Sequence, residues 1–236
     1  MLLFIKKKIE RVNQFLFKDV RHAWILTYYF ALLWQFSYIE KRNDHITNWV
    51  SVSADGYIPY LNFFVVFYIL WFLYVGVALT VFVFLEKSDF FRLTFNIFVG
   101  MTICYVIYML YPHGQPLREA LTAHETNVFN RMVYYIYSCD NPANTAPSIH
   151  VLNSIAVTVA INRSEFFRKR MGLIIGANIL NVLIILSTVF IKQHSVIDIV
   201  LAFILSLFMQ LIIYKVDWKS IFENARGRHQ QRKIKL

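Results

Sequence analysis

The chain has 236 residues, of which 58% are hydrophobic and 16% charged, and its net charge is +10. About a quarter of the residues of a soluble domain are charged, so the composition argues against a soluble protein and indicates an integral membrane protein. A basic balance is also typical of nucleic-acid binding. Cations collect, however, in the cytoplasmic loops of membrane proteins, and we expect the lipid bilayer rather than nucleic acid as a partner.

The first segment, residues 1–22, alternates cations with apolar residues. The apolar residues Ile5, Ile9, Val12, Leu16 and Val20 fall on one helical stripe. This pattern is typical of an amphipathic helix on the cytoplasmic surface of an anionic membrane. A solvated basic tail is the alternative.

Six apolar blocks follow in one membrane domain, residues 23–214. They cover Ala23–Ile39, Tyr60–Leu85, Leu93–Leu110, Ile149–Phe166, Met171–Phe190 and Val196–Tyr214. Crossing a bilayer takes about 20 helical residues. The sequence therefore predicts an all-α integral membrane bundle of about six transmembrane helices, followed by a basic cytoplasmic tail at residues 215–236.

The distribution of cations predicts the orientation of this bundle. If the N-terminus is cytoplasmic, the inner segments hold 19 Lys and Arg residues and the outer segments hold five, whereas acidic residues divide seven to seven. Cytoplasmic loops carry the excess of Lys and Arg. We therefore expect both termini in the cytoplasm, most simply that of a bacterium, with the chain in the plasma membrane.

Two stretches that contain candidate catalytic residues lie on the expected outer face. The long connection 111–148 ends in Pro147-Ser148-Ile149-His150, where the fourth span begins, and a short turn carries His194 just before the sixth span. Between His150 and His194 the chain crosses the membrane inward and returns. Both histidines are therefore expected at one outward-facing site.

His194 and Asp198 are four residues apart, which places them on one face of a helix. The carboxylate can hold one ring nitrogen of His194 and leave the other free to attack a substrate. His150 can supply the proton that a leaving oxygen needs. Together these residues predict in-line attack by a histidine on a phosphorus atom.

Phosphate binding requires cations and N–H donors. Arg118 can offer a planar guanidinium fork, although pairing with Glu119 or Glu125 in the loop is an alternative. Pro147 at a helix start leaves amide N–H groups facing outward, and Ser148 adds a hydroxyl.

The motif blocks resemble the signature of the type 2 phosphatidic acid phosphatase superfamily. This superfamily includes bacterial lipid phosphate phosphatases, vanadium haloperoxidases and sphingolipid head-group transferases. Its blocks read Lys-x6-Arg-Pro, Pro-Ser-x-His and Ser-Arg-x5-His-x3-Asp. The chain matches them at Arg118 in the first block, at Pro147, Ser148 and His150 in the second, and at Ser187, His194 and Asp198 in the third.

The resemblance implies that His194 forms a phosphohistidine, that Asp198 orients it and that His150 is the general acid. It also implies that Ser148 and Ser187 lie at the phosphate. The chain departs from the signature where Tyr111 replaces the lysine, Glu119 the proline and Thr188 the third-block arginine. Lys192, two residues before His194, is a candidate replacement for the lost charge. A third block without its arginine also resembles the inositol phosphorylceramide synthase-like branch.

We therefore expect a phosphoric monoester hydrolase that acts on a phosphomonoester or pyrophosphate lipid in the outer leaflet without a cofactor. Phosphatidic acid, phosphatidylglycerol phosphate and isoprenyl pyrophosphate are substrates that the resemblance implies. A lipid head-group phosphotransferase and a catalytically weakened lipid-binding protein are the alternatives. A zinc site made of the two histidines and Asp198 is a further alternative. Asp198 can instead serve as the orienting partner of His194, no third strong ligand then has a clear spacing, and we expect no metal.

Overall fold

All the regular secondary structure in the described part of the chain is helical. A computed structural model describes residues 20–43, 48–218 and 220. The α-helices are α2 (Tyr28–Arg42), α3 (Val65–Val83), α4 (Lys87–Leu110), α5 (Val128–Cys139), α6 (Ile149–Arg163), α7 (Glu165–Arg168), α8 (Met171–Phe190) and α9 (Val196–Ile213). Short 3-10 helices are η2 (Arg21–Thr27), η3 (Ser53–Tyr57) and η4 (Asn62–Phe64).

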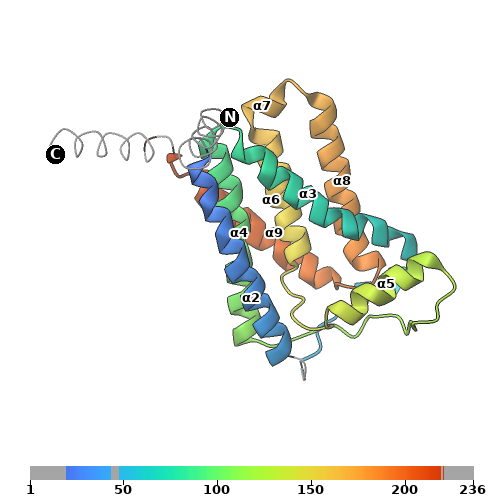
Figure 1. Cartoon of the computed structure of the whole chain (residues 1–236). Helices are drawn as coiled ribbons and strands as arrows, with labels where there is room; N and C mark the ends of the chain where they lie inside the picture. The colour runs from blue at the N-terminus through green and yellow to red at the C-terminus, as the bar shows by residue number, and fades with distance from the viewer. Residues whose placement is uncertain (1–19, 44–47, 219, 221–236) are drawn as a thin grey trace, which may run out of the picture.

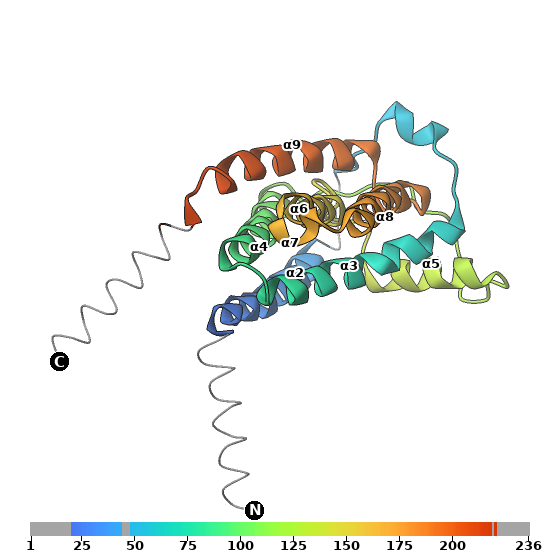
Figure 2. The ribbon, with the colours of Figure 1, turned by 90° about the horizontal axis from the view of Figure 1, so that it is seen from above.

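The long helices form three layers around α6 (Figures 1 and 2). Helix α9 covers one side, α4, α6 and α8 form the middle, and α2 and α3 cover the other side. Helix α6 packs against α3, α4, α8 and α9, and ten of its 15 residues are buried. The core of the bundle therefore surrounds α6.

Four helical segments are long and apolar enough to cross a membrane: Asn62–Val83, Lys87–Leu110, Met171–Phe190 and Val196–Ile213. Their composition is compatible with an integral membrane protein. Each of the six predicted blocks overlaps a helix, but α2 and α6 have only 15 residues each, with η2 (Arg21–Thr27) leading directly into α2. A 15-residue helix rises about 22 Å, which is less than the roughly 30 Å of a hydrocarbon core.

The polar residues within α6 are explained by its central position. Asn153, Ser154 and Thr158 are almost fully buried. The hydroxyls of Thr158 and Tyr74 are 2.8 Å apart, and Ser154 Oγ donates to the carbonyl of His150 at 2.6 Å. The Thr158 hydroxyl thus contacts α3, the Ser154 hydroxyl bonds a carbonyl of its own helix, and each buried hydroxyl has a partner.

The first and last described segments lie at the same end of the bundle. The His22 ring lies 6.3 Å from the ring of Phe91, and the Trp218 ring stacks on Phe91 at 6.2 Å. Most of the segments 1–22 and 215–236 lies outside the described residues. Their predicted roles therefore stay predictions.

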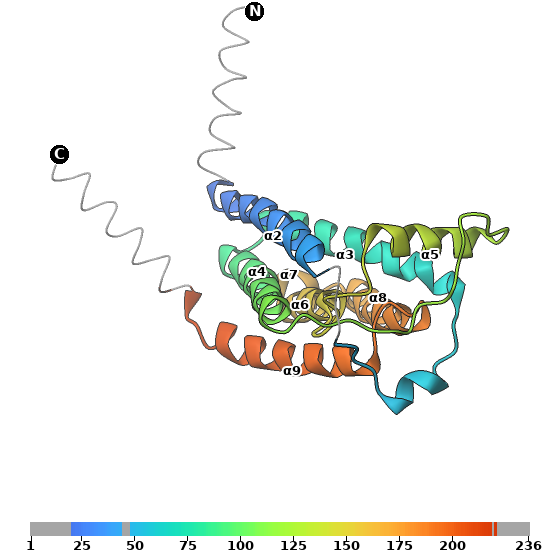
Figure 3. The same cartoon turned by 90° about the horizontal axis from the view of Figure 1, so that it is seen from below.

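The long connection after α4 contains a helix that the sequence analysis did not predict. Helix α5 begins after Asn127, whose side chain accepts hydrogen bonds from the amides of Phe129 and Asn130 at 2.8 and 3.4 Å. Figure 3 shows α5 running beside α3. It covers the end of the bundle where the predicted site residues lie.

Candidate active site

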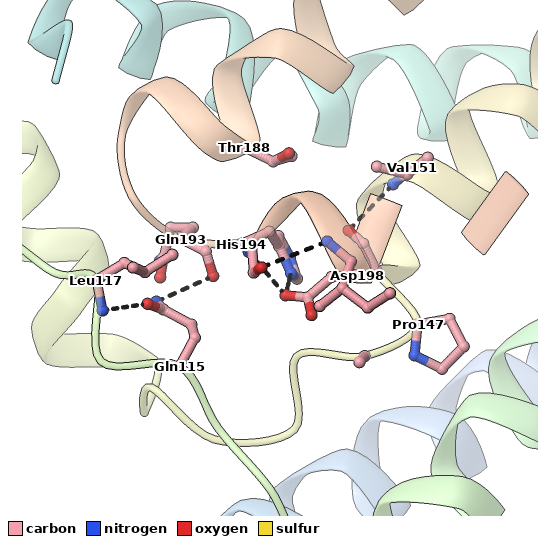
Figure 4. Close-up of polar contacts among 12 residues, drawn as sticks. Gln115, Leu117, Pro147, Val151, Thr188, Gln193, His194 and Asp198 are labelled. Carbon is pink, nitrogen blue, oxygen red and sulfur yellow. Dashed lines mark hydrogen bonds and ion pairs between the residues drawn. The ribbon is translucent and has the colours of Figure 1, made fainter. Parts of the chain in front are cut away.

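His194 lies in the turn between α8 and α9 and contacts Asp198, one helical turn further on (Figure 4). His194 Nδ1 is 3.1 Å from Asp198 Oδ2, which also accepts the amide N–H of Ser195 at 3.0 Å. A carboxylate only accepts hydrogen bonds, so this contact requires the proton on Nδ1, and in the neutral ring Nε2 then carries the lone pair. The predicted histidine–aspartate pair is therefore present in the structure.

The start of α9 fixes this pair in place. Ser195 is the N-cap, and its hydroxyl accepts the amide N–H of Ile197 at 3.3 Å. In return, the Asp198 side chain accepts the N–H of Ser195, which completes a capping box. Asp198 thus accepts hydrogen bonds both from the helix start and from His194.

His150 lies in the first turn of α6, beside the start of α9. The amide of Ser148 donates to the carbonyl of Asp198 at 3.1 Å, which joins the two helix starts. The rings of His150 and His194 are 5.7 Å apart at a tilt of 60°. On its other side His150 contacts Tyr68 and Trp71, with ring centroids 4.4 and 4.3 Å away. The two histidines are close enough to contact one phosphate group.

Both histidines line one end of a cavity of about 770 Å³. Apolar and aromatic side chains from α2, α3, α4 and α5 form most of its wall. The polar end is formed by Asp140, Asn141, Asn144, Thr145, His150, Gln193 and His194. A largely apolar cavity with a few convergent polar groups is typical of a small-molecule site.

The structure places Arg118 beside this site but not on the cavity wall. Its Nη1 donates to the carbonyls of Tyr137 at 3.1 Å and Asp140 at 2.6 Å. Its Nη2 donates to the carbonyl of Asn141 at 2.9 Å and to Gln193 Oε1 at 2.7 Å. A phosphate would have to displace these acceptors. The guanidinium makes no ion pair within the described residues, with Glu119 or any other acid.

The other predicted phosphate ligands are also engaged elsewhere. Lys192 Nζ donates to the carbonyls of Ile58 at 2.6 Å and Asp55 at 3.3 Å. Ser187 Oγ donates to the carbonyl of Ile184 at 2.6 Å, and Ser148 Oγ accepts the amide of Val151 at 3.4 Å. None of these three lines the cavity. The structure therefore unites the proposed nucleophile, its aspartate and the proposed acid, but not the predicted phosphate ligands.

Two buried residues of the 111–118 block bind the backbone next to the site residues. Gln115 Nε2 donates to the carbonyls of Lys192 at 2.8 Å and Gln193 at 3.3 Å, and its Oε1 accepts the amide of Leu117 at 2.6 Å (Figure 4). His113 Nε2 accepts the amide of Ala146 at 2.8 Å. The sequence analysis gave Gln115 no role in the site and placed His113 at most at its border. Their position between two prolines was the only signal.

Asp140 is a titratable group of the site that the sequence analysis also missed. It lines the cavity with the two histidines. Burial raises its pKa to about 6, the Glu40 carboxyl adds to the increase, and Arg118 opposes it. This carboxyl therefore exchanges a proton not far below neutral pH.

Within residues 20–43, 48–218 and 220, no group of three His, Cys, Asp or Glu side chains is arranged to hold a metal ion.

Comparisons of the chain with protein-family models, curated proteins and solved structures give no match. The resemblance to the phosphatase superfamily therefore rests on the motif residues alone.

Proposed function

We propose that this protein is a membrane lipid phosphate phosphatase that works through a phosphohistidine on His194. The observation that carries the proposal is the hydrogen-bonded His194–Asp198 pair facing His150 at the polar end of an apolar cavity. A nucleophile held by an orienting carboxylate beside a second acid–base group is the usual arrangement for covalent catalysis. The motif resemblance points to the same chemistry.

The reaction has two steps. In the first, the Nε2 lone pair of His194 attacks phosphorus, the bond from phosphorus to the leaving oxygen breaks, and His150 gives that oxygen a proton. Asp198 stabilises the positive charge that develops on the His194 ring. In the second, water attacks the phosphohistidine, gives a proton to His150 and releases phosphate and free His194.

Amides at the start of α6, whose first residues line the cavity, can receive the phosphate. Ile149 and His150 are the first two residues of α6, and helix-start amides lack acceptors within their own helix. They also lie at the positive end of the helix dipole. Arg131, on α5, is the one Lys or Arg among the residues that line the cavity.

The cavity supports a lipid as the substrate. Its apolar wall includes Leu33 of α2 and Ile69 and Phe72 of α3, whose side chains are also exposed to the surroundings of the bundle or the cavity. An acyl or isoprenyl chain can therefore pass from an apolar exterior into the cavity while the phosphate meets the histidines. Each buried methylene group contributes about 0.8 kcal/mol.

We further propose six membrane spans, with both termini in the cytoplasm and the site facing outward from the plasma membrane. The cation asymmetry supports this topology. The shared position of the two described chain ends, opposite the site, is compatible with it.

Labelling of single cysteines tests the topology. In a Cys139→Ser background, where buried Cys104 is retained, Ala123→Cys and Lys169→Cys place thiols at exposed positions of opposite loops. An impermeant thiol reagent on intact cells should label only position 123, and permeabilised cells should show both. Labelling of position 169 alone in intact cells would reverse the proposed orientation.

A head-group phosphotransferase is a second candidate, favoured by the polar end of the cavity. Asp140 and Thr145 are suited to alcohol hydroxyls, and Thr145 Oγ1 is buried with no partner among the described residues. Incubation with phosphatidic acid, phosphatidylglycerol phosphate or isoprenyl pyrophosphate, with and without inositol or glycerol, separates the candidates. Free phosphate identifies a hydrolase and a phosphorylated alcohol a transferase. Neither product from any lipid indicates a binding protein.

We expect activity to persist in excess chelator, because histidine, amides and side chains supply all the groups that the proposed steps use. The measurement is the rate of phosphate release before and after dialysis against EDTA. Complete loss that one divalent metal restores would overturn the metal-independent mechanism.

A further inference from the structure

The segment 52–58, between α2 and α3, lies against the turn that carries His194. Figure 3 shows η3 beside the start of α9. Asp55, within η3, is only 3% exposed. Nothing in the sequence connects this loop with the motif blocks, which begin more than 50 residues later.

The Asp55 carboxylate binds the start of α9. Its Oδ2 accepts the hydroxyl of Ser195 at 2.6 Å and the amide of Val52 at 2.8 Å, and its Oδ1 accepts the amide of Val196 at 2.8 Å. Amides at a helix start lack partners within the helix and carry partial positive charge. Hydrogen bonds to an ionised acceptor are about twice as strong as neutral ones.

Lys192 binds the same segment from the other side of His194. Its ammonium donates to the carbonyls of Asp55 and Ile58, and its side chain is almost fully buried. The backbone of Lys192 has a φ of 55°, a conformation that costs energy for a residue with a side chain. The tertiary contacts of Lys192 oppose relaxation of this turn.

We propose that Asp55 and Lys192 are positioning residues that hold the turn 192–196 so that His194 stays paired with Asp198. His194 is fixed from both directions, since Lys192 precedes it and Ser195 follows it. The catalytic part of the proposal rests on the proposed function, but the positioning of the ring does not. Lys192 acts on the backbone of the turn and not on the phosphate.

Substitution of Asp55 by asparagine is a sharp test because it changes hydrogen bonding without changing size. The carboxylate receives three donors, from Val52, Ser195 and Val196. An amide has one acceptor oxygen, and its NH₂ group faces N–H groups that cannot accept. The start of α9 should therefore loosen in Asp55→Asn, and the pairing of His194 with Asp198 should loosen with it.

The first readout is the ¹⁵N NMR spectrum of the His194 imidazole in the detergent-solubilised chain, assigned by its loss in His194→Asn. The wild-type ring should show one tautomer, with a protonated Nδ1 and an unprotonated Nε2. Asp55→Asn should move both shifts toward those of a tautomer mixture. Asp89→Asn, at the opposite end of the bundle, is the matched control and should leave the His194 signals unchanged.

The second readout separates positioning from phosphate binding. Asp55→Asn and Lys192→Met should each lower kcat at least tenfold with KM within about twofold, since they act on the nucleophile and not on the substrate. Lys192→Met keeps the apolar stem and removes only the charge. A rise in KM with kcat unchanged would overturn the assignment and return Lys192 to phosphate binding.

The two readouts separate this inference from the proposed function. His194 shifts that are identical in wild type and Asp55→Asn would overturn the positioning role, whatever the activity. Altered shifts in a chain that processes no lipid phosphate would keep the positioning role and reject the proposed function.

Discussion

Replacement of His194 by asparagine should lower the rate of lipid phosphate hydrolysis by about 10⁴-fold or more, since removal of a nucleophile costs that much where the bond to it forms in the transition state. Asparagine is chosen because its Nδ2 can still donate to Asp198, as His194 Nδ1 does at 3.1 Å. The substitution therefore removes the attacking nitrogen and retains the hydrogen bond that the carboxylate accepts. The measurement is phosphate release from each lipid in detergent micelles.

His22→Ala is the histidine control for this experiment. His22 Nε2 is 2.9 Å from the carbonyl of Val83, at the end of the bundle away from the cavity. This variant should keep activity within about threefold, since His22 contacts Phe90 and Val83 far from the cavity. The stability of His194→Asn is checked by its unfolding temperature, which should equal that of the wild type. If the folded variant retains more than a hundredth of wild-type activity, His194 is not the nucleophile.

Replacement of His150 by phenylalanine should lower the rate with a lipid phosphate by about 10² to 10⁴-fold, the usual contribution of general acid–base catalysis. Phenylalanine retains the ring contacts that His150 makes with Tyr68 and Trp71 but carries no proton. The loss should be largest for poor leaving groups such as lipid alcohols. With para-nitrophenyl phosphate, whose leaving group needs no proton, formation of the adduct should slow by less than about tenfold.

This dependence on the leaving group distinguishes a general acid from a structural residue. A structural defect in His150→Phe would slow both substrates alike. His124→Ala, in the exposed loop before α5, controls for changes on the same face of the protein. Equal loss with the two substrates would assign His150 a role in packing and leave the source of the proton open.

The helical architecture could largely be predicted from hydrophobic blocks, although helix ends could not. Helix α8 begins and ends at the predicted residues, Met171 and Phe190. Helix α4 begins at Lys87, six residues before the predicted block, because its first turn is polar and contributes nothing to hydropathy. Helix α6 ends at Arg163 because Ser164 adopts an extended conformation.

Helix α5 shows the limit of a hydropathy argument. Its residues Val128, Met132, Tyr135 and Ile136 follow helical spacing and line the cavity, but polar residues separate them and the helix is only 12 residues long. Reading 111–148 as a membrane connection hid this amphipathic pattern. Asn127 as an N-cap was the local signal that could have revealed it.

The arrangement of His150, His194 and Asp198 could be predicted because their geometry is local. The spacing from His194 to Asp198 is one helical turn, and the topology brings His150 to the same end. The partners of Arg118 and Lys192 could not be predicted, because both side chains bind backbone carbonyls of segments distant in sequence, such as Asn141 and Ile58. Every residue has a backbone carbonyl, so the amino-acid sequence does not indicate which residues accept these hydrogen bonds.

The most direct test of the central claim is to find phosphate on His194. The chain is mixed with a ³²P-labelled lipid phosphate and denatured within milliseconds in alkaline detergent, because acid hydrolyses a phosphorus–nitrogen bond. Peptide mapping should locate the label on the peptide that carries His194, and His194→Asn should take up none. Label on another residue, or full turnover of the lipid by His194→Asn, would contradict the proposed mechanism.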